Sequence, residues 1–194
     1  MRKHLIALAA TLCFGATGMA FAAGTGSIDK NTHKVTEDKI EAQYKADKKA
    51  CDDMKGNAKD VCKAEAKGKE KVAKAENDAQ YKPSPKADEK VKKAKADADY
   101  NVAKEKCDDQ TGNAKDVCKK DAKAAHEAAK GQAKEEKAAA TKGATSSAAM
   151  GASKDAKEDT NDAQYSAAKE RCDAMKGDTK DKCVADAKKR FNKS

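Results

Sequence analysis

Six of the seven cysteines fall into three pairs, and each pair occupies the same place in a unit that occurs three times. The unit is a tyrosine, six residues, a cysteine, ten residues and a second cysteine. Paired thiols can form disulfides, bind zinc or exchange electrons. There is no Cys-x-x-Cys redox pair, and the ten-residue spacing differs from that of common zinc knuckles. The spacing therefore favours disulfides. The copies are Tyr44, Cys51, Cys62; Tyr100, Cys107, Cys118; and Tyr165, Cys172, Cys183.

A glycine near the middle of each inter-cysteine segment predicts how the thiols meet. Glycine adopts a positive φ just past a helix end without the penalty that a Cβ brings. In the first copy Asn57 follows this glycine and is suited to cap the next helix, and Asp60 complements the helix dipole. Each copy thus predicts a helical hairpin with its two cysteines opposite each other at the closed end. The predicted turns are Gly56, Gly112 and Gly177, and the predicted disulfides are Cys51–Cys62, Cys107–Cys118 and Cys172–Cys183.

The tyrosine of each unit lies two helical turns before the first cysteine, so the two side chains share one face of a helix. Met54 and Met175 extend this stripe by three residues, where the middle copy has Gln110. We expect the stripe to be the thin apolar seam of each hairpin. The alternative is a stripe that binds a ligand. The predicted seam residues are Tyr44, Met54, Tyr100, Tyr165 and Met175.

Other reactive residue types are scarce. His33 and His126 are far from every cysteine in sequence, and we expect both to be solvated. Asp52 and Asp53 could bind a cation together with Asp60, but charge at a helix end is the simpler interpretation. No nucleophile is paired with a base, so the sequence predicts no enzyme, no catalytic residue, no cofactor and no metal site.

The first 22 residues have the pattern of a secretory signal peptide. Arg2 and Lys3 form a basic start, residues 5–14 are apolar, and the segment 20–22 reads Ala-Phe-Ala. We expect cleavage before Ala23 and a periplasmic or secreted protein. The apolar run is shorter than the roughly 20 residues that span a bilayer, so we expect no transmembrane anchor after cleavage.

Composition limits what the exported part can bury. Every leucine lies in the predicted signal peptide, tryptophan is absent, and alanine supplies most of the apolar content. Alanine buries little apolar area, so a large core and a compact enzyme domain are not expected, and disulfides are the expected substitute. The formal net charge is +9, but lysines alternate with acids, a pattern typical of solvated helices. It lacks the clustered arginines and aromatics of a specific nucleic-acid surface.

The fold predicted is all-α and elongated: three disulfide-stapled hairpins joined by long Ala/Lys-rich helices and flexible linkers, without a core shared between hairpins. The segment Asn77–Tyr81 repeats residues 161–165 letter for letter, but Pro83 and Pro85 interrupt it. Ser84 and Pro85 predict the start of a new helix. The predicted divisions are a flexible lead over 23–38, hairpins over 39–82, 83–140 and 154–194, and a linker over 141–153.

The Tyr-Lys-x-x-Lys-x-x-Cys-Asp of the first unit and the segment from Gly56 to Cys62 resemble exported Ala/Lys-rich proteins of Gram-negative cell envelopes, often labelled TolA-like. A fainter similarity is to exported PsiF-type repeats. The resemblance implies a non-enzymatic periplasmic protein that acts as a spacer or interaction module, with an envelope protein as its partner. The alternative is a lysine-rich stress protectant or binder of an anionic envelope polymer. The sequence specifies neither the partner nor the oligomeric state.

Overall fold

The structure is a computed structural model that describes residues 27–143 and 145–193. The predicted signal peptide and its cleavage site before Ala23 lie outside the described residues. Within the described part the chain is all-α, as predicted, with six helices and no strand. The helices are α1 (Lys30–Ala50), α2 (Gly56–Tyr81), α3 (Pro85–Cys107), α4 (Gly112–Lys142), α5 (Ser147–Cys172) and α6 (Gly177–Arg190).

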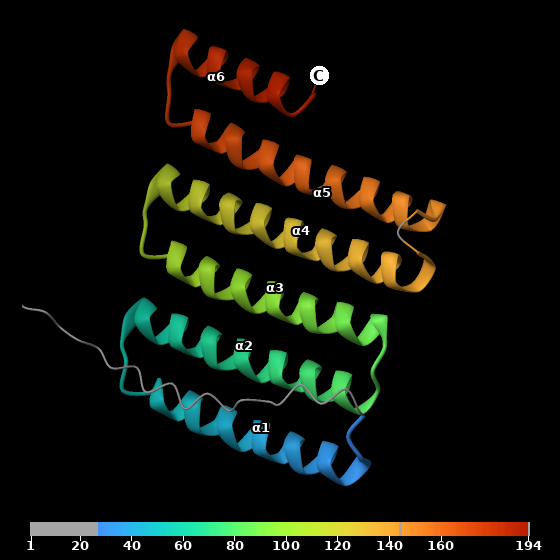
Figure 1. Cartoon of the computed structure of the whole chain (residues 1–194). Coiled ribbons are helices and arrows are strands. Elements are labelled where there is room, and N and C mark those ends of the chain that lie inside the picture. Colours follow the sequence, from blue (N-terminus) through green and yellow to red (C-terminus); the bar gives the residue numbers. More distant parts are fainter. Residues whose placement is uncertain (1–26, 144, 194) are drawn as a thin grey trace, which may run out of the picture.

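The helices lie side by side in chain order and alternate in direction, so that they form one elongated layer (Figure 1). The hairpins are α1–α2, α3–α4 and α5–α6. Helix α2 also packs against α3, and α4 packs against α5. The expectation that the hairpins share no packed core is therefore wrong: they form one continuous array. All three hairpin turns lie along the same edge of the layer (Figure 1).

Close approach of small residues makes this packing possible without leucine. A Cβ built on Gly68 of α2 would lie 2.8 Å from the Cβ of Ala98 in α3. A Cβ built on Gly131 of α4 would lie 2.8 Å from the Cβ of Ala156 in α5. Helices that approach so closely gain dense van der Waals contact from little side-chain volume. The buried alanines are Ala66, Ala96, Ala124, Ala133, Ala138, Ala149, Ala156, Ala167 and Ala187.

The turns confirm the glycine prediction. Gly56, Gly112 and Gly177 have φ values of 56°, 55° and 54°, which a Cβ would disfavour. The predicted capping role of Asn57 is wrong, because the N-cap position of α2 is Lys55 and no side chain caps this helix. The side chain of Asn57 has a different partner, described below.

Two helices begin at other residues than the sequence predicted, and one begins where it predicted. Helix α1 starts at Lys30, inside the predicted flexible lead, because the carboxylate of Asp29 accepts hydrogen bonds from the first-turn amides. The predicted linker over 141–153 is mostly helical: α5 begins at Ser147, and Ser146 caps it. Ser84 caps α3 and Pro85 begins it, as predicted. No helix in the described residues is long and apolar enough to cross a bilayer.

Candidate functional site

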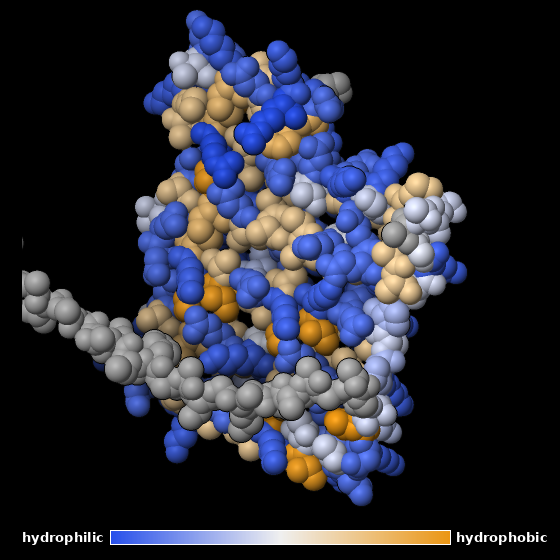
Figure 2. All heavy atoms as spheres, in the orientation of Figure 1, coloured by the Kyte–Doolittle hydropathy of each residue, from blue (hydrophilic) through white to orange (hydrophobic). Residues whose placement is uncertain are grey.

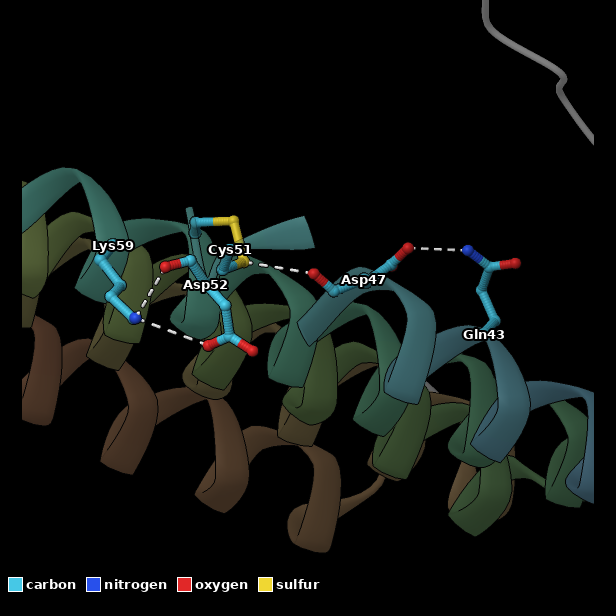
Figure 3. Close-up of a disulfide and its surroundings, with 6 residues drawn as sticks. Gln43, Asp47, Cys51, Asp52 and Lys59 are labelled. Carbon is cyan, nitrogen blue, oxygen red and sulfur yellow. Dashed lines mark hydrogen bonds and ion pairs between the residues drawn. A yellow bond between two sulfur atoms is a disulfide. The ribbon is translucent and has the colours of Figure 1, made fainter. Parts of the chain in front are cut away.

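The three predicted disulfides are present, and their cysteines are separated by nearly the same distances. Their Cα–Cα distances are 5.7, 5.6 and 5.7 Å, and each joins cysteines 11 residues apart. The first cysteine of each pair is fully buried, and Cys51 contacts the carbonyl oxygen of Asp47 (Figure 3). Buried sulfurs of this kind are structural rather than reactive. The pairs are Cys51–Cys62, Cys107–Cys118 and Cys172–Cys183.

An ion pair crosses each stapled turn in the same register. The aspartate after the first cysteine meets the lysine seven residues further on, as Asp52 and Lys59 do in Figure 3. In the second hairpin Lys119 and Lys115 both contact the carboxylate of Asp108 and lower its pKa to about 2. Asp52 was expected to act as a charge at a helix end, and its carboxylate in fact forms an ion pair with Lys59 of the following helix.

The predicted seam is correct only in part. Tyr44, Tyr100 and Tyr165 are half-buried, but Met54 and Met175 are 43% and 39% exposed. The methionines fail to extend the stripe because the first helix of each hairpin ends near its cysteine. Both methionines therefore lie in the turn and not on the helix.

Histidines supply contacts that the sequence analysis missed. The side chain of His33 on α1 is only 15% exposed and stacks on Tyr81 of α2, with ring centroids 4.5 Å apart. Its Nε2 lies 3.1 Å from Oδ1 of Asp78. Asn77 donates a hydrogen bond to the backbone carbonyl of His33. Aspartate, tyrosine and histidine thus clamp the ends of α1 and α2 that lie away from the disulfide.

The second hairpin has an equivalent clamp. The side chain of His126 on α4 is 12% exposed and stacks on Tyr100 of α3, with ring centroids 4.7 Å apart. Its Nε2 lies 2.6 Å from Oδ1 of Asp97. The expectation that His33 and His126 are solvated is therefore wrong. A usable signal was present in the sequence, since an aspartate stands three residues before each of these tyrosines.

The third hairpin keeps the clamp but replaces the histidine. Phe191 occupies the place of His126 and packs edge-on against Tyr165, and Lys193 pairs with Asp162. Asn161 donates to the carbonyl of Phe191, as Asn77 does to that of His33. The Asn-Asp-Ala-Gln-Tyr segment, which occurs twice, thus holds the helix pair together in both the first and the third hairpin.

Two contacts join neighbouring hairpins in the same register at both junctions. The side chain of Asn57 donates a hydrogen bond of 2.8 Å to the carbonyl of Glu105, near the end of α3. Asn113 donates one of 2.9 Å to the carbonyl of Glu170 in α5. Each of these carbonyls also accepts a hydrogen bond from the backbone amide three residues further on, that of Asp108 or Asp173. The asparagine therefore adds a second hydrogen bond in the last turn of the neighbouring helix.

An ion pair accompanies each of these hydrogen bonds. Lys106 pairs with Glu65 across the first junction at 3.6 Å, and Arg171 pairs with Asp121 across the second at 2.5 Å. We call the amide hydrogen bond and the ion pair together the junction contacts. They join α2 to α3 and α4 to α5.

A shallow groove of about 720 Å³ runs along the first junction. Its floor is formed by small and β-branched residues of α2 and α3, and the ion pair between Lys95 and Glu76 lies at its rim. Figure 2 shows that hydrophilic side chains dominate the face in view, with apolar patches between them. The floor residues are Gly68, Val72, Ala73, Ala98, Val102 and Ala103.

No family model, curated protein or solved structure matches the chain. The site therefore rests on its geometry alone: three covalently stapled hairpins, clamped internally and joined to one another through the junction contacts.

Proposed function

We propose that this chain is a non-enzymatic, exported helical-repeat protein that acts as a spacer or interaction module of the cell envelope. The observation that carries the proposal is the pair of junction contacts, which recur in the same register at both junctions. They couple three small hairpins into one extended surface, which is how repeat proteins build binding faces. The disulfides support an oxidising compartment outside the cytoplasm.

The groove along the first junction is the part of this surface best suited to a protein partner. Its floor is apolar and includes Val72 and Val102, while Lys106 and Glu65 lie at its border. Apolar contact surrounded by a polar rim is the usual anatomy of a protein interface.

Affinity capture from envelope extracts under non-reducing conditions tests the proposal. We expect a partner that stays bound at high ionic strength and is lost with Val102→Lys, which places a charge in the groove. The matched control is Val35→Lys, because Val35 is 52% exposed on α1 and lies outside the groove. Equal capture by both variants, or capture that high salt abolishes, would contradict an apolar interaction through the groove.

The formal net charge of +9 supports a second candidate, a lysine-rich binder of anionic envelope polymers. Binding of that kind depends on summed charge and is screened beyond the Debye length of about 8 Å at physiological salt. It should therefore disappear at high ionic strength and be insensitive to Val102→Lys. Many lysines, such as Lys95 and Lys137, are already paired with carboxylates, which makes this candidate the weaker one.

A further inference from the structure

We propose that His33, Asp78 and Glu37 form a binding site for a divalent transition-metal ion, with Zn²⁺ as the probe. One ligand atom from each of the three residues lies within 4.8 Å of the other two. Imidazole nitrogen and carboxylate oxygen together suit zinc and similar ions better than calcium or magnesium. The site is independent of the proposed partner groove, since it joins α1 to α2 at the end away from the disulfide.

The first two ligands are already neighbours. His33 Nε2 and Asp78 Oδ1 are 3.1 Å apart. Two ligands bound to one tetrahedral zinc at about 2.0–2.1 Å lie roughly 3.3 Å apart. In the hydrogen bond Oδ1 lies near the line along which Nε2 would bind an ion, so the carboxylate of Asp78 has to turn aside to admit the ion, which would replace this hydrogen bond.

Glu37 supplies the third ligand from the same helix as His33. It stands four residues after His33, so both side chains lie on one face of α1. Its carboxylate lies 3.8 Å from Nδ1 of His33, the ring nitrogen that would not bind the ion, so the side chain has to swing round the ring edge to reach an ion at Nε2. It is 49% exposed and free to do so. Asp78 is 56% exposed and similarly free to adjust. Water would complete the coordination.

The imidazole, in contrast, is held in place before an ion arrives. His33 is stacked on Tyr81, and its backbone carbonyl accepts a hydrogen bond from Asn77. Oδ1 of Asn77 is buried and has no hydrogen-bond partner among the described residues. An unsatisfied buried acceptor is uncommon in proteins, and a bound water is the usual donor that satisfies one. Because the imidazole is already fixed, only the two carboxylates have to be ordered when an ion binds.

His126 provides an internal comparison. It makes the same contacts with Asp97 and Tyr100, but the carboxylate beside its Nδ1 belongs to Glu127, the next residue in the sequence. Successive residues on a helix point in different directions. The three groups do not form a cluster of the kind found around His33. The proposal therefore places the metal in the first hairpin and not in the second.

Calorimetric titration of the oxidised full-length chain with ZnCl₂ tests this assignment. All measurements use a His4→Asn, Cys13→Ser background, so that these two residues of the undescribed N-terminal segment contribute no ligand. We expect one zinc per chain, and NMR shifts confined to the ring signals of His33 and Tyr81. Because the imidazole must be neutral to bind, affinity should fall as the solution is acidified.

The variants decide the outcome. His33→Asn should abolish binding, and Glu37→Gln, an exposed change that leaves the fold intact, should weaken it by about tenfold or more. His126→Asn and Glu127→Gln should leave the affinity unchanged. No saturable binding below about millimolar zinc, an unchanged affinity in Glu37→Gln, or equal losses in the His33 and His126 variants would overturn the proposal.

Discussion

Replacing Gly131 with alanine tests whether the hairpins pack against one another. Gly131 lies inside α4, where alanine is normally the better residue by about 1 kcal/mol. In an isolated hairpin this substitution should stabilise the protein. In the array the new Cβ would lie 2.8 Å from the Cβ of Ala156, closer than real Cβ atoms approach, and a tight 3.3 Å from its Cα.

The magnitude follows from these two opposing effects. Overpacking of one methyl group costs about 1–3 kcal/mol, and the gain in helix propensity offsets about 1 kcal/mol of it. Gly131→Ala should therefore lower the free energy of unfolding by about 0–2 kcal/mol. Gly151 of α5 is the matched control, because it is exposed and a Cβ there meets nothing within 4 Å. Gly151→Ala should raise the free energy of unfolding by about 1 kcal/mol.

Thermal unfolding followed by circular dichroism measures the difference between the two variants with disulfides intact. We expect the free energies of unfolding of the two variants to differ by about 1–3 kcal/mol. For a chain of this size, each kcal/mol corresponds to a difference of roughly 2–4 °C in melting temperature. Gly68→Ala should behave like Gly131→Ala, since its Cβ would meet Ala98 at 2.8 Å. If Gly131→Ala stabilised the protein as much as Gly151→Ala does, α4 and α5 would not be packed and the hairpins would be independent.

Three further predictions concern the other contacts. Asn113→Asp replaces the donor to the Glu170 carbonyl with an acceptor and should cost about 1–2 kcal/mol in urea unfolding, whereas the control Asp178→Asn at the exposed equivalent position should change stability by less than about 0.5 kcal/mol. The pKa of Asp108 is lowered from 3.8 to about 2, so its ion pairs stabilise the fold above pH 3.8 and that contribution is lost as pH falls through about 2. Acid titration should show this component in the wild type and not in Asp108→Asn, and an identical profile would refute the pairing. Replacing both Cys107 and Cys118 with serine should lower the stability of the second hairpin by about 3 kcal/mol, seen as faster amide hydrogen exchange there.

The features that sequence alone predicted are local. Each disulfide and each glycine turn depends on a segment of a dozen residues, in which the spacing leaves one sensible geometry, as in Cys51–Cys62 around Gly56. The error at Met54 has a local cause as well: helical periodicity was extended past the residue at which α1 ends. Helical periodicity predicts which side chains share a face only up to the residue at which the helix ends.

The features that sequence analysis missed join residues far apart in the chain. Asn57 was suited to cap its own helix, and nothing local indicated that its amide would reach Glu105, 48 residues on. The packing between hairpins depends on Gly68 and Ala98, residues that carry almost no hydrophobic signal. For the histidine clamps a signal existed in the aspartate three residues before each tyrosine, but pairing it with His33 or His126 requires the fold.

The junction contacts also bear on whether copies of the chain could be joined end to end in the same way as the hairpins. Head-to-tail stacking of copies would place α6 of one molecule against α1 of the next and produce an open filament. Asp178 stands where Asn57 and Asn113 stand in the other hairpins, and a carboxylate cannot donate to a carbonyl. Ala50 stands where Lys106 and Arg171 provide the cation. The two outer helices therefore lack the residues that form both junction contacts inside the array, so a stack of copies could not be joined in the way that the hairpins are joined.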